Sequence, residues 1–345
     1  MQTIDQPAHR IDDAERPLWI GQTPGAWGDV LRTIDLDEAH DAAAMIAAAG
    51  LEWRVEQYPL EAVIGREYQS LRVAVPRHVA NVRSDTRSVL GVVGEGYEPL
   101  QNLSAFAFCD GITDSGRAHW IGAGSTRGGA RVHALMRLDR EVRIGGAEGE
   151  DVLPLLCFRN GHDGGLAVTV SVAPFRLACL NGMLLPLADT QRTWKARHTA
   201  NVEAKLADAR RTLGIAWRYY DQLEELGAQM IGERIGEGEF ERFLARLVPL
   251  PEPKPDRSNG GRAVRNAERV REAIRTAYRT APDLDDIRGT RWGALQAVTA
   301  YVDHTQPTRQ TAGRTHAEAR FERATEPQPL KDRALELLSG GGNLS

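Results

Sequence analysis

Hydrophobic and polar positions alternate in short runs through the first third of the chain. The runs "LEWRVEQYPL" (51–60), "LRVAVPRHVANVRS" (71–84) and "SVLGVVGEGYEPL" (88–100) are rich in β-branched residues and interrupted by Gly or Pro, which is typical of antiparallel strands. A short alanine-rich helix is expected before them, with Asp37 as its N-cap and Gly50 as its stop. After them, "NLSAFAFCDGITDSG" (102–116) predicts a helix, and "AHWIGAGSTRGGARVHALMRLD" (118–139) predicts two strands joined by a glycine-rich turn.

A hairpin is predicted over residues 151–173. The segment "DVLPLLCFRN" (151–160) is an apolar strand, and "GHDGG" (161–165) contains the Asp-Gly pair of a tight turn. The following "LAVTVSVA" (166–173) alternates large apolar residues with small or polar ones, as a strand does when its two faces differ. We expect Asp163 to serve the turn itself.

The second half of the chain has helical periodicity. Apolar residues recur at spacings of three and four from Val202 to Met230, which predicts a helix of about 45 Å with one apolar stripe. A second amphipathic helix is predicted around Val264–Ala277, and a third over "RWGALQAVTAYVDH" (291–304). Strands followed by helices, without strand–helix alternation, predict an α+β fold: an antiparallel sheet with hairpins, backed by a long amphipathic helix, plus C-terminal helices.

The same pattern divides the chain into five segments. We expect an irregular N-terminal arm over 1–30, an α+β core domain over 31–247 and a Pro/Gly-rich linker over 248–261. A helical C-terminal segment over 262–325 and a flexible tail over 326–345 complete the chain.

Composition narrows the class of protein. The 345 residues are 42% hydrophobic and 26% charged, as in ordinary globular proteins. The three cysteines, Cys109, Cys157 and Cys179, form no CxxC pair, so a reduced, cytoplasmic protein without a zinc site is expected. Because no run of 18 apolar residues occurs, no membrane association is expected. No cofactor is expected, since the Gly-Lys dipeptide of a phosphate-binding loop is missing.

Charge is segregated along the chain although its net value is only −4. Residues 176–218 contain eight cations and three carboxylates, a local charge of +5, and residues 254–279 have the same balance. Aromatic residues accompany the first cluster, as in proteins that stack single-stranded bases. This pattern predicts a phosphate-binding track, with these candidate residues: Arg176, Arg192, Lys195, Arg197, His198 and Lys205. A solvated helix face with its aromatics in the core is the alternative.

Two arrangements of reactive residues were weighed as catalytic sites. Cys179 has the residue type of a thiol nucleophile, with His162 or His198 as its activating base and Asn181 as an orienting group. The apolar surroundings "FRLACL" favour a buried structural cysteine instead. The pair His162–Asp163 resembles a metal-binding dipeptide, but its place in a glycine turn favours a structural role.

Four stretches resemble the phage/plasmid-like protein family, a domain of unknown function found in phages, prophages and plasmids. They are "SVLGVVGEGYEPLQN" (88–102), "NGHDGGLAVTVSVAPFRLACLNGMLL" (160–185), "RHTANVEAKLADARRTL" (197–213) and "GTRWGALQAVTAYVDH" (289–304). The resemblance extends over roughly residues 30–340. The family's recognisable positions are His162, Asp163, Gly164, Arg176, Cys179, Asn181 and His198. Gly182 departs from the pattern, because relatives usually have a small hydroxyl residue there.

Three functions are open at this point. The first is a non-enzymatic protein that binds or anneals single-stranded DNA, in outline like the Rad52-like annealing proteins that phages carry. The second is an oligomeric interaction protein that engages a host factor, and the third is an enzyme that uses Cys179. The resemblance implies a mobile-element setting but assigns no reaction.

Overall fold

The protein is described as a computed structural model. It describes residues 30, 32–33, 41–65, 71–114, 116–145, 149–177, 181–187, 192–198, 211–251, 260–311 and 313–339. All of the predicted arm except residue 30 therefore lies outside the described residues, as do Cys179, Lys205 and most of the predicted linker.

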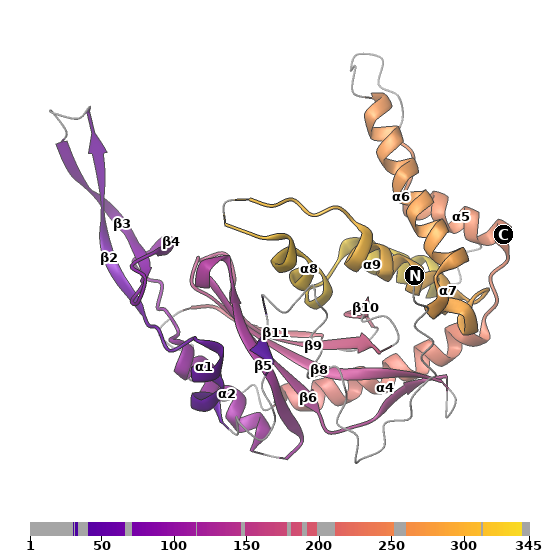
Figure 1. Cartoon of the computed structure of the whole chain (residues 1–345), viewed down its shortest axis with the longest axis horizontal. Helices are drawn as coiled ribbons and strands as arrows, with labels where there is room; N and C mark the ends of the chain where they lie inside the picture. The colour runs from indigo at the N-terminus through magenta and orange to yellow at the C-terminus, as the bar shows by residue number, and fades with distance from the viewer. Residues whose placement is uncertain are drawn as a thin grey trace, which may run out of the picture.

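A large antiparallel sheet forms the centre of the molecule (Figure 1). Its strands follow the order β1-β5-β6-β8-β9-β10, with β7 paired to β8 and β11 paired to β9. Their bounds are β1 Arg32–Thr33, β5 Ala118–Thr126, β6 Arg131–Leu138, β7 Val142–Ile144, β8 Glu150–Gly161, β9 Val168–Arg176, β10 Asn181–Gly182 and β11 Thr193–Ala196. Strands β8 and β9 are the predicted hairpin, and its Asp163 side chain accepts a hydrogen bond from the Gly165 amide at 2.8 Å, as a turn residue does.

A second sheet contains β2 (Val55–Ile64), β3 (Leu71–Arg83) and β4 (Val89–Gly94), all antiparallel. The outer halves of β2 and β3 extend away from the body as an arm (Figure 1). The N-terminal part of α6 projects as a second arm at the other side of the molecule.

Helices cover both faces of the large sheet. They are α1 Ala42–Ala49, α2 Asn102–Thr113, α4 Arg211–Gly232, α5 Glu237–Leu247, α6 Gly260–Thr280, α7 Arg291–Ala300, α8 His316–Thr325 and α9 Pro329–Ser339, with a 3₁₀ turn η3 over Pro282–Ile287 and a π-helical turn η4 over Tyr301–Thr305. Helices α2 and α4 pack on one face, where Phe106, Leu156 and Tyr220 belong to one buried cluster. Helix α8 packs on the opposite face, where Leu155, Cys157 and Phe321 form another.

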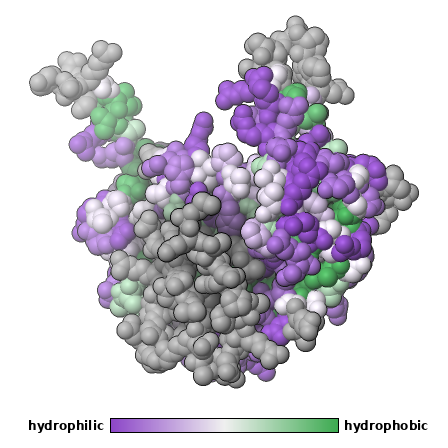
Figure 2. Space-filling view, turned by 45° about the vertical axis from the view of Figure 1, so that its right-hand side comes forward, coloured by the Kyte–Doolittle hydropathy of each residue, from purple (hydrophilic) through white to green (hydrophobic). Residues whose placement is uncertain are grey.

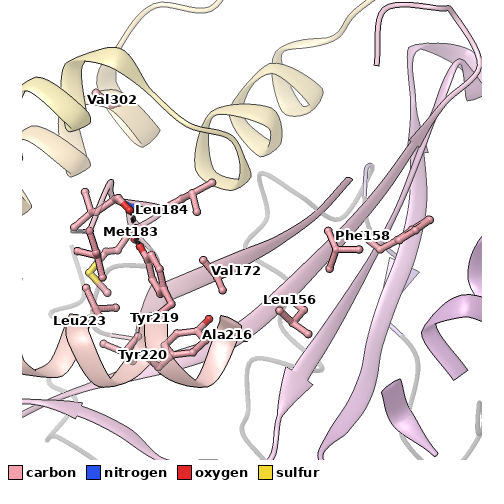
Figure 3. Close-up of a cluster of buried hydrophobic side chains, with 14 of the residues drawn as sticks. Leu156, Phe158, Val172, Met183, Leu184, Ala216, Tyr219, Tyr220, Leu223 and Val302 are labelled. Carbon is pink, nitrogen blue, oxygen red and sulfur yellow. Dashed lines mark hydrogen bonds between the residues drawn. The ribbon is translucent and has the colours of Figure 1, made fainter. Parts of the chain in front are cut away.

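The apolar stripe of the long helix is buried as predicted, over the part of it that the structure describes. Ala216, Tyr220, Leu223 and Met230 of α4 are at most 1% exposed, and the first three lie over β8 and β9 with Leu156 and Val172 (Figure 3). The hydroxyl of Tyr219 donates to the Met183 carbonyl at 2.9 Å, and that of Tyr220 donates to the Leu155 carbonyl at 2.7 Å. The α+β fold is thus confirmed.

Two local predictions are wrong. The N-cap of α1 is Asp41 rather than Asp37, because the Asp41 carboxylate accepts the Ala44 amide at 2.8 Å. The tail predicted to be flexible from residue 326 contains α9, in which Ala334, Leu335 and Leu338 are buried. Among the described helices, none combines the length and apolar character needed to cross a membrane.

Candidate functional site

The turn that contains His162 and Asp163 joins the two sheets. The side chain of Asn81 in β3 donates to the His162 carbonyl at 2.8 Å. Gly91 of β4 lies so close that an added Cβ would be 2.6 Å from the Cα of Asp163. We conclude that this motif fixes the second sheet on the body.

Both imidazoles at this joint are buried, and burial lowers the pKa of each. His162 is 0% exposed, and its Nε2 donates to Asn102 Oδ1 at 3.1 Å. Burial lowers the pKa of His162 to about 3, and the nearby His198 lowers it further. His198 is 7% exposed and stacks on Tyr97 with ring centroids 4.7 Å apart, and burial lowers its pKa as well. His198 is therefore enclosed by packing in the joint, while its predicted contact with DNA stays a prediction.

Two further cations of the predicted track, Arg176 and Arg192, form ion pairs with carboxylates of the same chain. Arg176 is 1% exposed, donates to Asp283 Oδ2 at 2.7 Å and forms an ion pair with Glu150. Arg192 holds both oxygens of Asp332 at 2.9 and 2.8 Å. These arginines attach the sheet to η3 and α9. Their guanidinium groups are paired within the fold, which does not favour the predicted contact with DNA.

Asn181 and Gly182 form a buried network of polar contacts with the C-terminal helices. We call this network the buried knot. Asn181 accepts a hydrogen bond from His304 Nε2 at 3.0 Å. The Lys331 ammonium donates to the Gly182 carbonyl at 2.7 Å and to Asp303 at 2.6 Å, and both members of this ion pair are at most 3% exposed. Burial raises the pKa of Asp303, and the Lys331 charge opposes that rise. An added Cβ on Gly182 would lie 2.0 Å from the Ala324 carbonyl oxygen, so only glycine fits at this position in this chain.

The two remaining described cations of the predicted track are exposed. Lys195 lies on β11, and Arg197 follows that strand. The register pairs His133 with Arg159, Arg159 with Thr169, and Thr169 with Lys195. Residues paired across neighbouring strands share a face, so Lys195 belongs to the face of the large sheet that α8 covers.

Arginines gather on that face around α8. Arg127, Arg131 and Arg314 share one carboxylate, Glu322, at 3.2, 3.5 and 3.1 Å. Arg159 pairs with Glu326 at 3.0 Å. Burial lowers the pKa of Arg323, and the neighbouring Arg314 and Arg320 lower it further, as expected where cations exceed anions.

We call this surface the cationic face. It contains eight cations and four carboxylates, a local charge of +4: Arg127, Arg131, Arg159, Lys195, Arg197, Arg314, Arg320 and Arg323 against Asp163, Glu318, Glu322 and Glu326. Lys195, Arg197 and Arg320 are exposed. A recess between α8 and the sheet admits about one water molecule, so the face offers a charged surface and not a substrate pocket there.

Sequence reasoning missed the arginines around α8. The sheet register brings His133 beside Arg159, and the docking of α8 places Phe321 on His133 and Thr325 on Arg159. Of the aromatic residues that accompany the first cluster, Tyr219 and Tyr220 are buried in the core, as the alternative interpretation predicted, whereas Trp194 and Trp217 are half-buried. Within the described ranges, no group of three His, Cys, Asp or Glu side chains is placed to hold a metal ion.

Comparison with known proteins places the chain in one family. No curated protein and no solved structure matches it. A family model described as "Domain of unknown function (DUF932)" matches residues 89–325. This range contains the turn of His162 and Asp163, the buried Asn181, Gly182 and Asp303, and most of the cationic face, whereas Asn81 and Lys331 lie outside it. The chain therefore belongs to the DUF932 family of domains of unknown function.

Proposed function

We propose that this protein binds single-stranded DNA through the cationic face and catalyses no reaction on it. The observation that carries the proposal is the placement of exposed Lys195 on the same sheet face as Arg159 and α8. Cations concentrated on one surface of a protein whose net charge is −4 attract a polyanion locally while the rest of the surface repels it.

The carboxylates on this face do not neutralise it. Glu322 is shared by three arginines. The pKa of Arg323 is lowered mainly by burial, and the neighbouring Arg314 and Arg320 add to that effect. A phosphate bound near Arg320 would supply the missing negative charge without displacing an existing ion pair. Arg320 is exposed and suitably placed for such a contact.

The geometry of the face favours a flexible strand over a duplex. Lys195 lies on an edge strand of the sheet, whereas Arg320 lies on the helix that packs above the sheet. A single strand can bend between these two levels, but a duplex has a persistence length of about 50 nm and cannot follow them without a large bending cost. Contact through phosphates also leaves sequence unread.

The proposal includes a biological setting, a phage or plasmid. The motifs resemble the phage/plasmid-like family, and mobile elements expose single strands during replication and recombination. Annealing of complementary strands would follow if two copies brought two bound strands together.

The experiment is binding of a fluorescent oligothymidine strand by the full chain, with a duplex of equal length for comparison. The test variant is Lys195→Ala/Arg197→Ala/Arg320→Ala. The matched control, Arg262→Ala/Arg265→Ala/Arg269→Ala, removes three exposed cations from the projecting end of α6. We expect the test variant to lose about tenfold or more in affinity while the control stays within about threefold of the wild type. Equal losses in both variants would show that only net charge matters, and would refute this face as the site.

A further inference from the structure

Exposed hydrophobic side chains are concentrated on the second sheet. Nine large hydrophobic residues are exposed in the described part of the chain, and seven belong to β2, β3 and β4: Tyr58, Val63, Ile64, Leu71, Val73, Val89 and Val92. Figure 2 shows the resulting hydrophobic surface in green on the arm, below its grey tip. Monomeric soluble proteins rarely expose apolar side chains that are gathered in this way.

The register places most of these residues on one face. Ile64 pairs with Leu71 and Ala62 with Val73 in the outer half, and Tyr58 pairs with Ala80, which pairs with Val92, in the inner half. Side chains two residues apart on a strand point to the same side, so Tyr58, Ala62 and Ile64 follow one line along β2. We call this surface the arm face.

The opposite side of the inner sheet is already used. Asn81 and Gly91 on that side contact the turn of His162 and Asp163. The arm face points away from this joint, and the outer half of the arm extends beyond the body (Figure 1). Because a two-stranded ribbon is marginally stable in water, a partner that covers the arm face would stabilise the arm.

The charges of the arm face select an apolar, uncharged partner. Arg87 bonds Glu56 at 2.7 Å and the Tyr58 hydroxyl at 3.0 Å, so these two charges at the inner end satisfy each other. Apart from the exposed His78, which is two residues from Ala80 on β3, the rest of the described arm face is mainly aliphatic, which suits neither phosphate nor an acidic peptide. The same face on a second chain has the required chemistry, and a two-fold axis would place the outer half of one arm on the inner half of the other.

Backbone geometry favours contact through the face over pairing through the strand edge. The backbone N–H and C=O of Val55 point away from β3 and bond the Gln101 side chain at 3.0 Å. By alternation the backbone of Pro59 points the same way, and proline has no N–H to donate there. Gln101 and Pro59 thus block edge-to-edge addition of another strand.

The area is sufficient for a reversible dimer. Ten residues of β2 span about 33 Å, and two to three strands give a width of about 10 to 14 Å. Two copies in contact would therefore bury on the order of 1,000 Å² of accessible surface in total, counting the surface of side chains that protrude from the sheet. This area is the lower limit for specific association. We propose that the arm face is the surface through which two copies of this chain associate, face to face, independently of DNA.

The test is sedimentation velocity of the full chain from about 1 to about 100 μM, a range that brackets micromolar association. The variants are Ile64→Glu and Val92→Glu on the arm face, and the control is Val63→Glu on the opposite side of the same strand. All three residues are more than half exposed, so the fold should persist, which far-ultraviolet circular dichroism checks.

We expect the wild type and Val63→Glu to reach twice the mass of one chain. The dimer dissociation constants of Ile64→Glu and Val92→Glu should be at least about tenfold higher. A wild type that stays monomeric at every concentration would overturn the proposal. Dimerisation of Ile64→Glu and Val92→Glu with the dissociation constant of the wild type would also overturn the proposal. Cosedimentation of a monomeric wild type with neutral phosphatidylcholine vesicles would identify a lipid surface as the partner in place of a second copy.

Discussion

The buried imidazole of His162 makes the protein less stable in mild acid. In the folded protein its pKa is about 3, because burial disfavours the charged ring. In the unfolded chain its pKa is about 6.5. The unfolded state therefore binds a proton from about pH 6.5 downward, while the folded state does not until about pH 3. Stability from this group is complete above pH 6.5 and falls as the pH is lowered through this window.

The magnitude follows from the two pKa values. At about pH 5 the unfolded ring is almost fully protonated and the folded ring is almost fully neutral. The gap of about 1.5 pH units below 6.5, at 1.36 kcal/mol per unit, lowers the free energy of unfolding by about 2 kcal/mol. His133 is buried with a pKa of about 3 for the same main reason and contributes a similar loss.

The assay is urea denaturation at about pH 7.5 and about pH 5 for the wild type and His162→Gln. Glutamine can still donate to Asn102 but cannot titrate. We expect the variant to be less stable than the wild type at neutral pH, while its stability difference between the two pH values is smaller by about 2 kcal/mol. An equal pH difference in both proteins would show that His162 is accessible or charged in the folded state, and would refute the reasoning.

Four further substitutions test the buried contacts and local packing by chemical denaturation. Lys331→Met leaves Asp303 buried without its counter-ion and should cost about 3 to 5 kcal/mol; the double variant Asp303→Asn/Lys331→Met should lose clearly less, and an equal loss would contradict a paired site. Gly182→Ser restores the family's hydroxyl but places a Cβ 2.0 Å from the Ala324 carbonyl oxygen, so a loss above about 2 kcal/mol is expected. Gly214→Ala, where no atom lies within 4 Å of an added Cβ, should be neutral or stabilising by up to about 1 kcal/mol, and the reverse order would show that packing at Gly182 is misplaced. Arg176→Met leaves Glu150 and Asp283 without their shared cation and should lower stability by about 3 kcal/mol or more; an unchanged midpoint would mean that this network is not formed.

Local periodicity predicted the parts of the fold that depend on local sequence. The hairpin over β8 and β9 and the stripe of α4 each bury residues at the spacing that the sequence shows. Helix α9 was missed because its burial depends on a distant partner. In the sequence Lys331 looks like a surface residue, because the carboxylate that accepts its hydrogen bonds, Asp303, is 28 positions away.

The candidate site was predicted in part for the same reason. Lys195 and Arg197 were identified as cations and are exposed. Arg176 and Arg192 were indistinguishable from them in sequence, since the carboxylates that bind them lie 107 and 140 positions away. The arginines around α8 were missed because a sheet register and a helix docking, neither visible in a linear pattern, place them beside Lys195.

The salt dependence of oligothymidine binding tests the cationic face most directly. Each phosphate neutralised on a single strand contributes about −0.7 to the slope of log affinity against log salt concentration. If Lys195, Arg197 and Arg320 each contact a phosphate, the triple alanine variant should bind more weakly, with a slope about 2 units shallower than that of the wild type. Binding by the wild type that does not respond to salt, or an unchanged slope in the variant, would contradict the account.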